Sequence, residues 1–197
     1  PDRFLDRYES LTIPLGPDPD GEDPITATLV RKQEPAPDAR GAVLYVHGFT
    51  DYFFHEPLAD FFADRGVAFY AIDLRKCGRS LGEQHTAHYT TDLRHYDEEL
   101  GLALDLISDE VGTEVPIVVA AHSTGGLIAA LWLDRLRTCA PDRHARVTGL
   151  LLNSPWLDLQ GEAYLRTLPA TLLIRAVAAV RPKAPVPQEL SEAYGES

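Results

Sequence analysis

The sequence is poor in the features that mark several classes of protein. It has only two cysteines, Cys77 and Cys139, which form no pair with metal-ligand spacing, so we expect reduced thiols and a cytoplasmic protein. No basic segment followed by an apolar core opens the chain, as a secretory signal peptide would. The most apolar stretch, residues 169–180, contains Arg175 and is too short to predict a membrane span. We therefore expect no stable membrane insertion.

Basic residues are also few. The chain has 18 lysines and arginines against 30 aspartates and glutamates, which gives a formal net charge of −12. Such a surface repels nucleic-acid phosphates and disfavours docking on anionic membranes, but it leaves an uncharged lipid substrate open. The histidines lack metal-ligand spacing with carboxylates or cysteines; His85 and His88 lie in a polar loop, where we expect them to be solvated. We expect no nucleic-acid partner, metal or cofactor.

Strand-like and helix-like patterns alternate along the first 155 residues. Apolar and β-branched runs predict strands at 11–15, 25–32, 42–46, 67–72, 115–120 and 146–153. Apolar residues at intervals of three or four predict helices at 56–65, from 93 to 107 with Thr91 or Asp92 as its cap, and at 124–137. We expect the first two strands to pair antiparallel at an edge, and the others to form a mostly parallel sheet with helices on both faces.

A serine between small residues follows the strand predicted at 115–120. Residues 121–125 are A-H-S-T-G, which matches the nucleophile-elbow pattern G-x-S-x-G with alanine in place of the first glycine. A buried strand precedes this motif, and an apolar helical pattern follows it. We predict Ser123 as the catalytic nucleophile. The alternative is a serine that only caps the following helix.

Two other polar loops follow apolar strands. Residues 47–50 are H-G-F-T, and residues 73–80 are D-L-R-K-C-G-R-S. Together with the elbow, in this order, they resemble the α/β-hydrolases, in the branch of the monoglyceride lipases, lysophospholipases and serine aminopeptidases (S33). The resemblance covers about residues 40–155. It implies an α/β-hydrolase fold and a serine hydrolase that needs no cofactor.

The resemblance also assigns roles around the nucleophile. The oxyanion hole would consist of the backbone amides of Phe49 and Thr124. The residues expected to support the elbow and the loop are His47, Gly48, His122, Gly125 and Gly126. For His47 and His122 we expect hydrogen bonds that orient the loops, and the alternative for either is the general base.

The acid and the base of a triad are harder to place. In the family the order is serine, then an acid, then histidine, and no histidine follows His144, which itself precedes the strand predicted at 146–153. Asp158 is a candidate acid in a variant arrangement, although a solvated carboxylate is the simpler interpretation, and we expect Asp73 to be structural. Another alternative is a self-associated site in which a second subunit supplies the histidine.

We therefore expect residues 1–155 to be the N-terminal part of a hydrolase core without its last strands. Residues 156–197 would begin a helical lid, with a core helix at 162–180 as the alternative, and the remainder of the same polypeptide would complete the fold. Phe49, Phe53 and Phe54 favour an apolar acyl substrate, such as an acylglycerol or a lysophospholipid. The alternatives are a peptidase or amidase of the same fold, and a non-catalytic ligand-binding protein.

Overall fold

The computed structural model describes residues 1–33, 38–157, 172 and 176–183. Contacts divide the chain into two compact units, Pro1–Leu157 and Asp158–Ser197. In the second unit residues 176–180 are helical, and most of the helix predicted at 162–180 lies outside the described residues. None of the helices in the described ranges has the length and apolar character needed to cross a bilayer.

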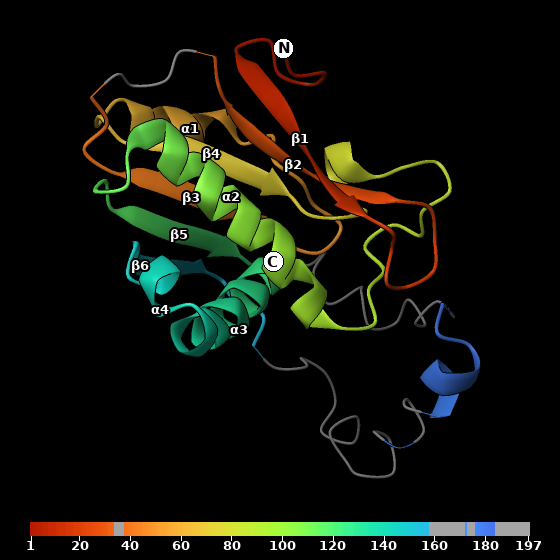
Figure 1. Ribbon diagram of the computed structural model, residues 1–197. Helices are drawn as coiled ribbons and strands as arrows, with labels where there is room; N and C mark the ends of the chain where they lie inside the picture. The colour runs from red at the N-terminus through yellow and green to blue at the C-terminus, as the bar shows by residue number, and fades with distance from the viewer. Residues whose placement is uncertain (34–37, 158–171, 173–175, 184–197) are drawn as a thin grey trace. The chain divides into compact units, whose positions relative to one another are not determined.

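The first unit is built on one six-stranded sheet (Figure 1). The strands are β1 (Tyr8–Gly16), β2 (Ile25–Lys32), β3 (Ala42–Val46), β4 (Ala68–Asp73), β5 (Ile117–His122) and β6 (Val147–Asn153). Their order across the sheet is β1-β2-β4-β3-β5-β6. β1 and β2 are antiparallel to their neighbours, whereas β4, β3, β5 and β6 are parallel to one another. The predicted strands, the antiparallel edge and the mostly parallel sheet are confirmed.

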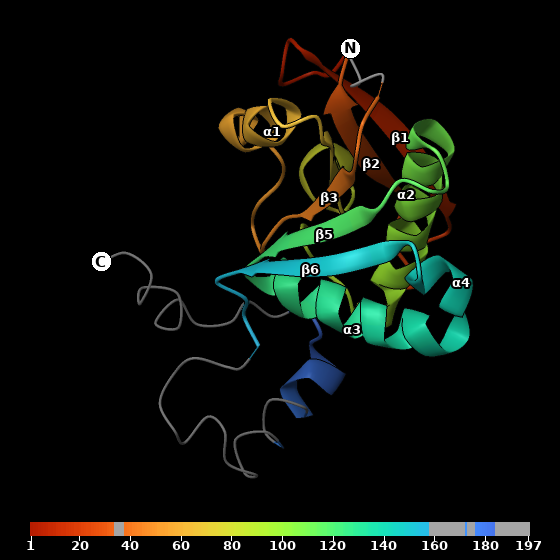
Figure 2. The same ribbon diagram turned by 90° about the vertical axis from the view of Figure 1, so that its left-hand side faces the viewer.

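Helices cover both faces of this sheet, as predicted (Figure 2). The helix α1 (Glu56–Ala63) lies on one face, and α2 (Tyr96–Val111) and α3 (Thr124–Cys139) lie on the other. β3 shows how the two cores arise, because successive side chains of a strand point to opposite faces. Leu44 and Val46 belong to the core under α2 and α3, while Val43 and Tyr45 belong to the core under α1.

Local contacts set the start of α2. A 3₁₀ turn, η2 (Leu93–His95), precedes the helix, and the Asp92 carboxylate caps this turn by accepting the Arg94 N–H at 2.9 Å. The helix α2 itself starts without a side-chain cap. Thr91, the other predicted cap, instead donates its hydroxyl to Asp20 at 2.5 Å. The capping interaction therefore falls on Asp92, and Thr91 ties this loop to the one between β1 and β2.

Candidate active site

Backbone strain is concentrated at the carboxyl ends of the parallel strands. Five non-glycine residues in the described part of the chain have positive φ: Thr50, Lys76, His88, Ser123 and Ser154. Each lies in a segment that follows β3, β4, β5 or β6. Such conformations are costly, cluster at functional sites, and persist only when the surroundings impose them. This edge is also where α/β sheets bind their ligands.

Ser123 occupies the sharp turn between β5 and α3. Its φ and ψ are 51° and −123°, and α3 begins at the next residue. The Ser123 N–H donates to the Asn153 carbonyl at 3.1 Å, and the Ser123 carbonyl accepts from the N–H groups of Gly126 at 3.0 Å and Trp156 at 2.9 Å. The Ser123 side chain makes no capping hydrogen bond to α3, so the interpretation as a simple helix cap is wrong.

Glycines allow the elbow to touch the end of β3. A Cβ atom on Gly125 would lie 2.3 Å from the His47 carbonyl oxygen and 2.7 Å from that of Val46. A Cβ on Gly48 would lie 3.0 Å from the Ser123 Cβ. The first turn of α3 is therefore packed against the backbone of β3, and the loop after β3 lies beside the serine.

His47 joins this loop to the end of β4. Its buried ring donates from Nδ1 to the Gly48 carbonyl at 2.7 Å and accepts the Leu74 N–H at Nε2 at 3.1 Å. Both ring nitrogens are occupied, so neither accepts the Ser123 proton in this arrangement. His122 lies with Nδ1 3.2 Å from the Asn153 carbonyl, the acceptor that the Ser123 N–H also uses.

Two backbone amides near the serine are free to bind an anion. Neither the Phe49 N–H nor the Thr124 N–H has an acceptor among the residues that the structure describes. Thr124 is the first residue of α3, where unpaired amides and the helix dipole favour negative charge. The Phe49 side chain is 63% exposed, and its ring lies 5.3 Å from that of His88.

The family to which the chain belongs is consistent with this geometry. The family described as Hydrolase_4, serine aminopeptidase, S33, matches residues 37–195. The chain belongs to this family. The resemblance seen in its motifs is thus confirmed. A search among proteins of curated function found no match.

Solved structures with the same fold include two lipases and a putative hydrolase. A lipase in its open form is 22% identical, with a TM-score of 0.65 over 96% of this chain and 59% of its own. A soluble variant of monoglyceride lipase from Saccharomyces cerevisiae, in complex with a substrate analog, is 19% identical, with a TM-score of 0.61 over 88% of this chain and 53% of its own. A putative hydrolase from Agrobacterium vitis S4 is 18% identical, with a TM-score of 0.59 over 95% of this chain and 62% of its own. The S33 chain therefore has the α/β-hydrolase fold and spans between 53% and 62% of these structures.

His88 approaches the site in a way the sequence did not indicate. Its ring Nδ1 lies 3.1 Å from the buried Cys77 Sγ, and its backbone N–H donates to the Lys76 carbonyl at 3.0 Å. Burial and the neighbouring His47 lower the pKa of His88, and burial raises the pKa of the Cys77 thiol. Both groups are therefore neutral near pH 7. The expectation of a solvated His88 is wrong, because its ring packs between Cys77 and Phe49.

His85, the other histidine of this loop, is also engaged. Its Nδ1 accepts the Gly82 N–H at 3.0 Å, and its Nε2 lies 3.1 Å from the Asp23 carbonyl. The ring is nevertheless exposed at these contacts, so the expectation of a solvated loop residue is not contradicted for His85. No group of three or more potential metal ligands is assembled in the described part of the chain.

The motif at 73–80 proves to be a buried ionic scaffold in the S33 chain. Arg75 donates from Nε to Glu99 at 2.6 Å, and Lys76 donates from Nζ to Asp18 at 2.6 Å. Burial disfavours the charge on Lys76, but Asp18 and Glu22 outweigh that effect and raise the pKa of Lys76. A loop with this composition looks solvent-exposed in sequence, and its partners are distant, so no local signal marked it as buried.

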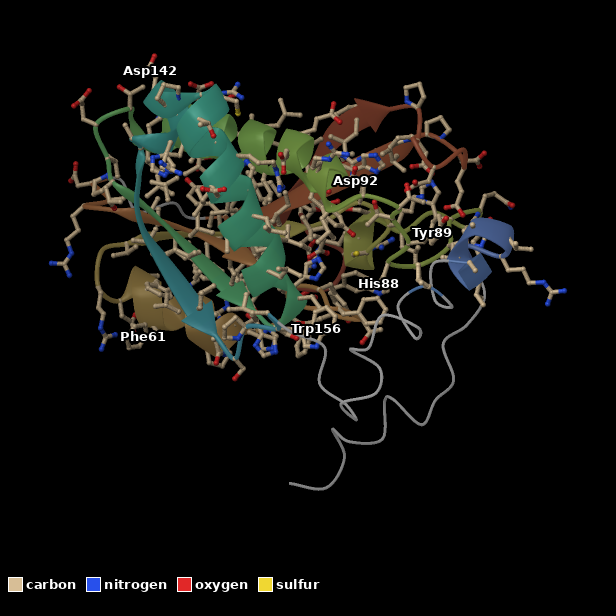
Figure 3. The ribbon with its side chains drawn as sticks, turned by 90° about the horizontal axis from the view of Figure 1, so that it is seen from below. Phe61, His88, Tyr89, Asp92, Asp142 and Trp156 are labelled. Carbon is tan, nitrogen blue, oxygen red and sulfur yellow. The ribbon has the colours of Figure 1, made fainter. Side chains whose placement is uncertain are left out.

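The remaining candidates for a base and an acid lie elsewhere. His144 ends α4 (Pro141–His144), just before β6 begins. Figure 3 shows this helix, marked by Asp142, at the opposite end of the sheet from Trp156 and His88. His144 is thus at the amino end of the parallel strands, away from Ser123, and Asp158 is outside the described residues.

Proposed function

We propose that this chain carries the nucleophile and the oxyanion hole of a serine hydrolase that cleaves carboxylic esters. The strained Ser123 carries the proposal, because its side chain caps nothing and two free amides accompany it at the carboxyl edge of the sheet. An α/β-hydrolase of the S33 family supplies the context in which such a serine attacks acyl groups.

The chemistry would proceed through an acyl-enzyme. The Ser123 Oγ attacks the ester carbonyl carbon while its proton passes to a general base, and the carbonyl oxygen becomes an oxyanion held by the Phe49 and Thr124 amides. Collapse breaks the bond to the alkoxy group, which leaves as an alcohol with that proton. Water then attacks the acyl-enzyme and releases the acid and the free serine. In this proposal the residues that shape the elbow and the loop are His47, Gly48, His122, Gly125 and Gly126.

The base and the acid would come from further residues of the same polypeptide. In the first unit neither His47 nor His144 is available to Ser123, for the reasons given above. β6 also ends the described sheet with an apolar and uncharged edge, which favours a further strand beside it. Residues 156–197 would begin the lid, and the Trp156 N–H anchors the start of that segment at Ser123.

We propose an apolar acyl substrate and a cytoplasmic protein. Phe49 and Phe54 are 63% and 50% exposed on the oxyanion loop, where they can contact an acyl chain. Phe53 is buried among Tyr8, Tyr45 and Phe69, so it stabilises the core and does not face substrate. Both cysteines are free thiols, which fits a reducing compartment. The family description, serine aminopeptidase, keeps peptide hydrolysis as the second candidate.

Covalent labelling tests the nucleophile. In the full-length polypeptide that we expect to contain this chain, a fluorophosphonate probe should add to Ser123, and Ser123→Ala should abolish labelling and lower ester turnover by about a million-fold. Ser154→Ala is the matched control, since Ser154 also has positive φ and follows a parallel strand. Parallel assays with a monoacylglycerol and an aminoacyl nitroanilide separate esterase from peptidase. Labelling that survives Ser123→Ala would refute the assignment.

A further inference from the structure

The loop that carries the Phe49 amide is held at two points. His47 fixes its start, as described above. Its end is fixed through both backbone groups of Phe53, because the Phe53 N–H donates to Asp73 Oδ1 at 2.9 Å and the Phe53 carbonyl accepts from Arg79 Nη1 at 2.9 Å. The Arg79 guanidinium thus holds the backbone of Phe53, at the end of the loop that carries the Phe49 amide.

Every nitrogen of that guanidinium is used. Nη1 contacts Asp73 Oδ2 at 2.9 Å as well as the Phe53 carbonyl, while Nε and Nη2 bind the two oxygens of Asp2 at 2.5 and 2.7 Å. The side chains of Arg79, Asp2 and Asp73 are buried. A bidentate pair fixes both the place and the plane of a guanidinium, so Asp2 orients the group that holds Phe53.

Asp2 is itself anchored to the sheet. Its Oδ1 accepts the N–H groups of Phe4 at 3.0 Å and Leu5 at 2.9 Å, and its own N–H donates to the carbonyl of Tyr8 at 2.8 Å, where β1 begins. Burial opposes ionisation of this carboxyl, but Arg79 and the two amides outweigh it and lower the pKa of Asp2. The carboxylate is therefore charged near pH 7.

We propose that Asp2 is a positioning residue for the oxyanion hole, acting through Arg79 and Phe53 on the Phe49 amide. This inference rests on the proposed function, since it names what holds one of the two oxyanion donors in place. Without the Asp2 carboxylate, Nε and Nη2 lose their buried acceptors, the guanidinium turns, and the Phe53 carbonyl loses its donor. Oxyanion donors act through fixed geometry, so a small displacement reduces transition-state binding more than substrate binding.

The test compares Asp2→Asn with Asp2→Glu and Glu56→Gln in the full-length enzyme. Asp2→Asn keeps a carbonyl oxygen for the Phe4 and Leu5 amides but removes the charge and one acceptor for Arg79. We expect kcat for a p-nitrophenyl ester to fall by about tenfold with KM within about twofold, and partial recovery in Asp2→Glu. Glu56→Gln removes the charge that pairs with Arg7 at 3.2 Å, in another contact of the segment before β1, and should match the wild type.

A transition-state mimic supplies the second readout. The affinity for a trifluoromethyl ketone, whose serine adduct places an oxyanion in the hole, should fall in Asp2→Asn by the same factor as kcat/KM. A lower melting temperature with unchanged kcat and inhibitor affinity would make Asp2 merely structural and overturn the inference, as would equal effects in Glu56→Gln. If Ser123→Ala retained the activity, the proposed function would fail and this inference with it. If Ser123→Ala is inactive, Asp2→Asn judges the inference alone.

Discussion

The elbow and the strand β6 are neighbours, because β6 pairs with β5 and β5 leads into the elbow. They differ in how closely their atoms are packed. At the elbow, atoms approach so closely that Gly125 has no room for a Cβ, and the surrounding loops are fixed by buried hydrogen bonds. Along β6, Leu150, Leu151 and Leu152 remain 37%, 50% and 38% exposed. The elbow is thus tightly packed within the described residues, whereas β6 presents an interior strand's side chains at an edge.

The opposite edge of the sheet shows what a protected edge looks like. β1 contains Pro14, which lacks an N–H, and its register shifts between Pro14 and Gly16. Glu9 on the same strand pairs with Arg31. Proline, bulges and charges are the usual means by which edges avoid pairing with other chains. β6, with the sequence V-T-G-L-L-L-N, has no proline and no charge, and its register shift lies at its start, between Val147 and Gly149, before the three leucines. We therefore interpret the leucine part of β6 as an edge that a further strand would cover.

The largest expected effect is the loss of ester turnover when the elbow is present without the strands that would follow β6. Residues 1–197 alone contain the proposed nucleophile and oxyanion hole, and no histidine in the described part of the first unit hydrogen-bonds the Ser123 hydroxyl. We expect their ester turnover to fall below that of the full-length polypeptide by on the order of a million-fold, comparable to removal of a catalytic histidine. Initial rates with the same p-nitrophenyl ester provide the comparison. Full activity of residues 1–197 would show that the base lies within them, and His122 and His88 would be the first positions to mutate.

Much of the fold could be predicted because its signals are local. Residues 42–46 are buried on both faces, so the strand is a continuous apolar run with the boundaries that the structure has. The strand, turn and helix around Ser123 were predictable for the same reason. The buried ions were not, because the burial of Lys76 depends on Asp18, which is 58 positions away in the sequence.

The different roles of the adjacent residues Phe53 and Phe54 could not be predicted from the sequence either. Phe53 and Phe54 are neighbours of the same type, yet one is buried in the core and the other is half exposed. Only the backbone direction of the loop, set by Asp73 and Arg79, distinguishes them. For similar reasons the spacing of His85 and His88 suggested solvent, whereas their ring nitrogens contact residues from other parts of the chain.

An intermediate effect should separate the elbow from β6 by stability. Gly125→Ala would place a Cβ 2.3 Å from the backbone oxygen of His47, which cannot move without disturbing β3, so we expect a loss of about 3 kcal/mol in the free energy of unfolding. Gly149→Ala in β6 is the control, since its Cβ would meet nothing closer than Val118 Cγ2 at 3.7 Å, and it should change the stability by less than about 0.5 kcal/mol. Urea unfolding of both variants measures the difference. Similar losses would mean that the elbow is no more tightly packed than β6.

The smallest effect should separate the two edges of the sheet by self-association. Leu151 is half exposed on β6, and Leu11 is 49% exposed on β1, so the two leucines offer matched positions on an unprotected and a protected edge. Residues 1–197 alone should associate through β6, and Leu151→Lys should weaken that association about tenfold, or about 1.4 kcal/mol, because a charge would then lie in an apolar contact. Leu11→Lys should leave it unchanged. Sedimentation velocity across a concentration series gives the dissociation constants. A monomeric wild type, or equal weakening by both substitutions, would contradict the interpretation of β6 as a strand that lacks its neighbour. The exposed leucines of β6 would then promote association no more than a leucine of β1, an edge already protected by proline, charge and a bulge.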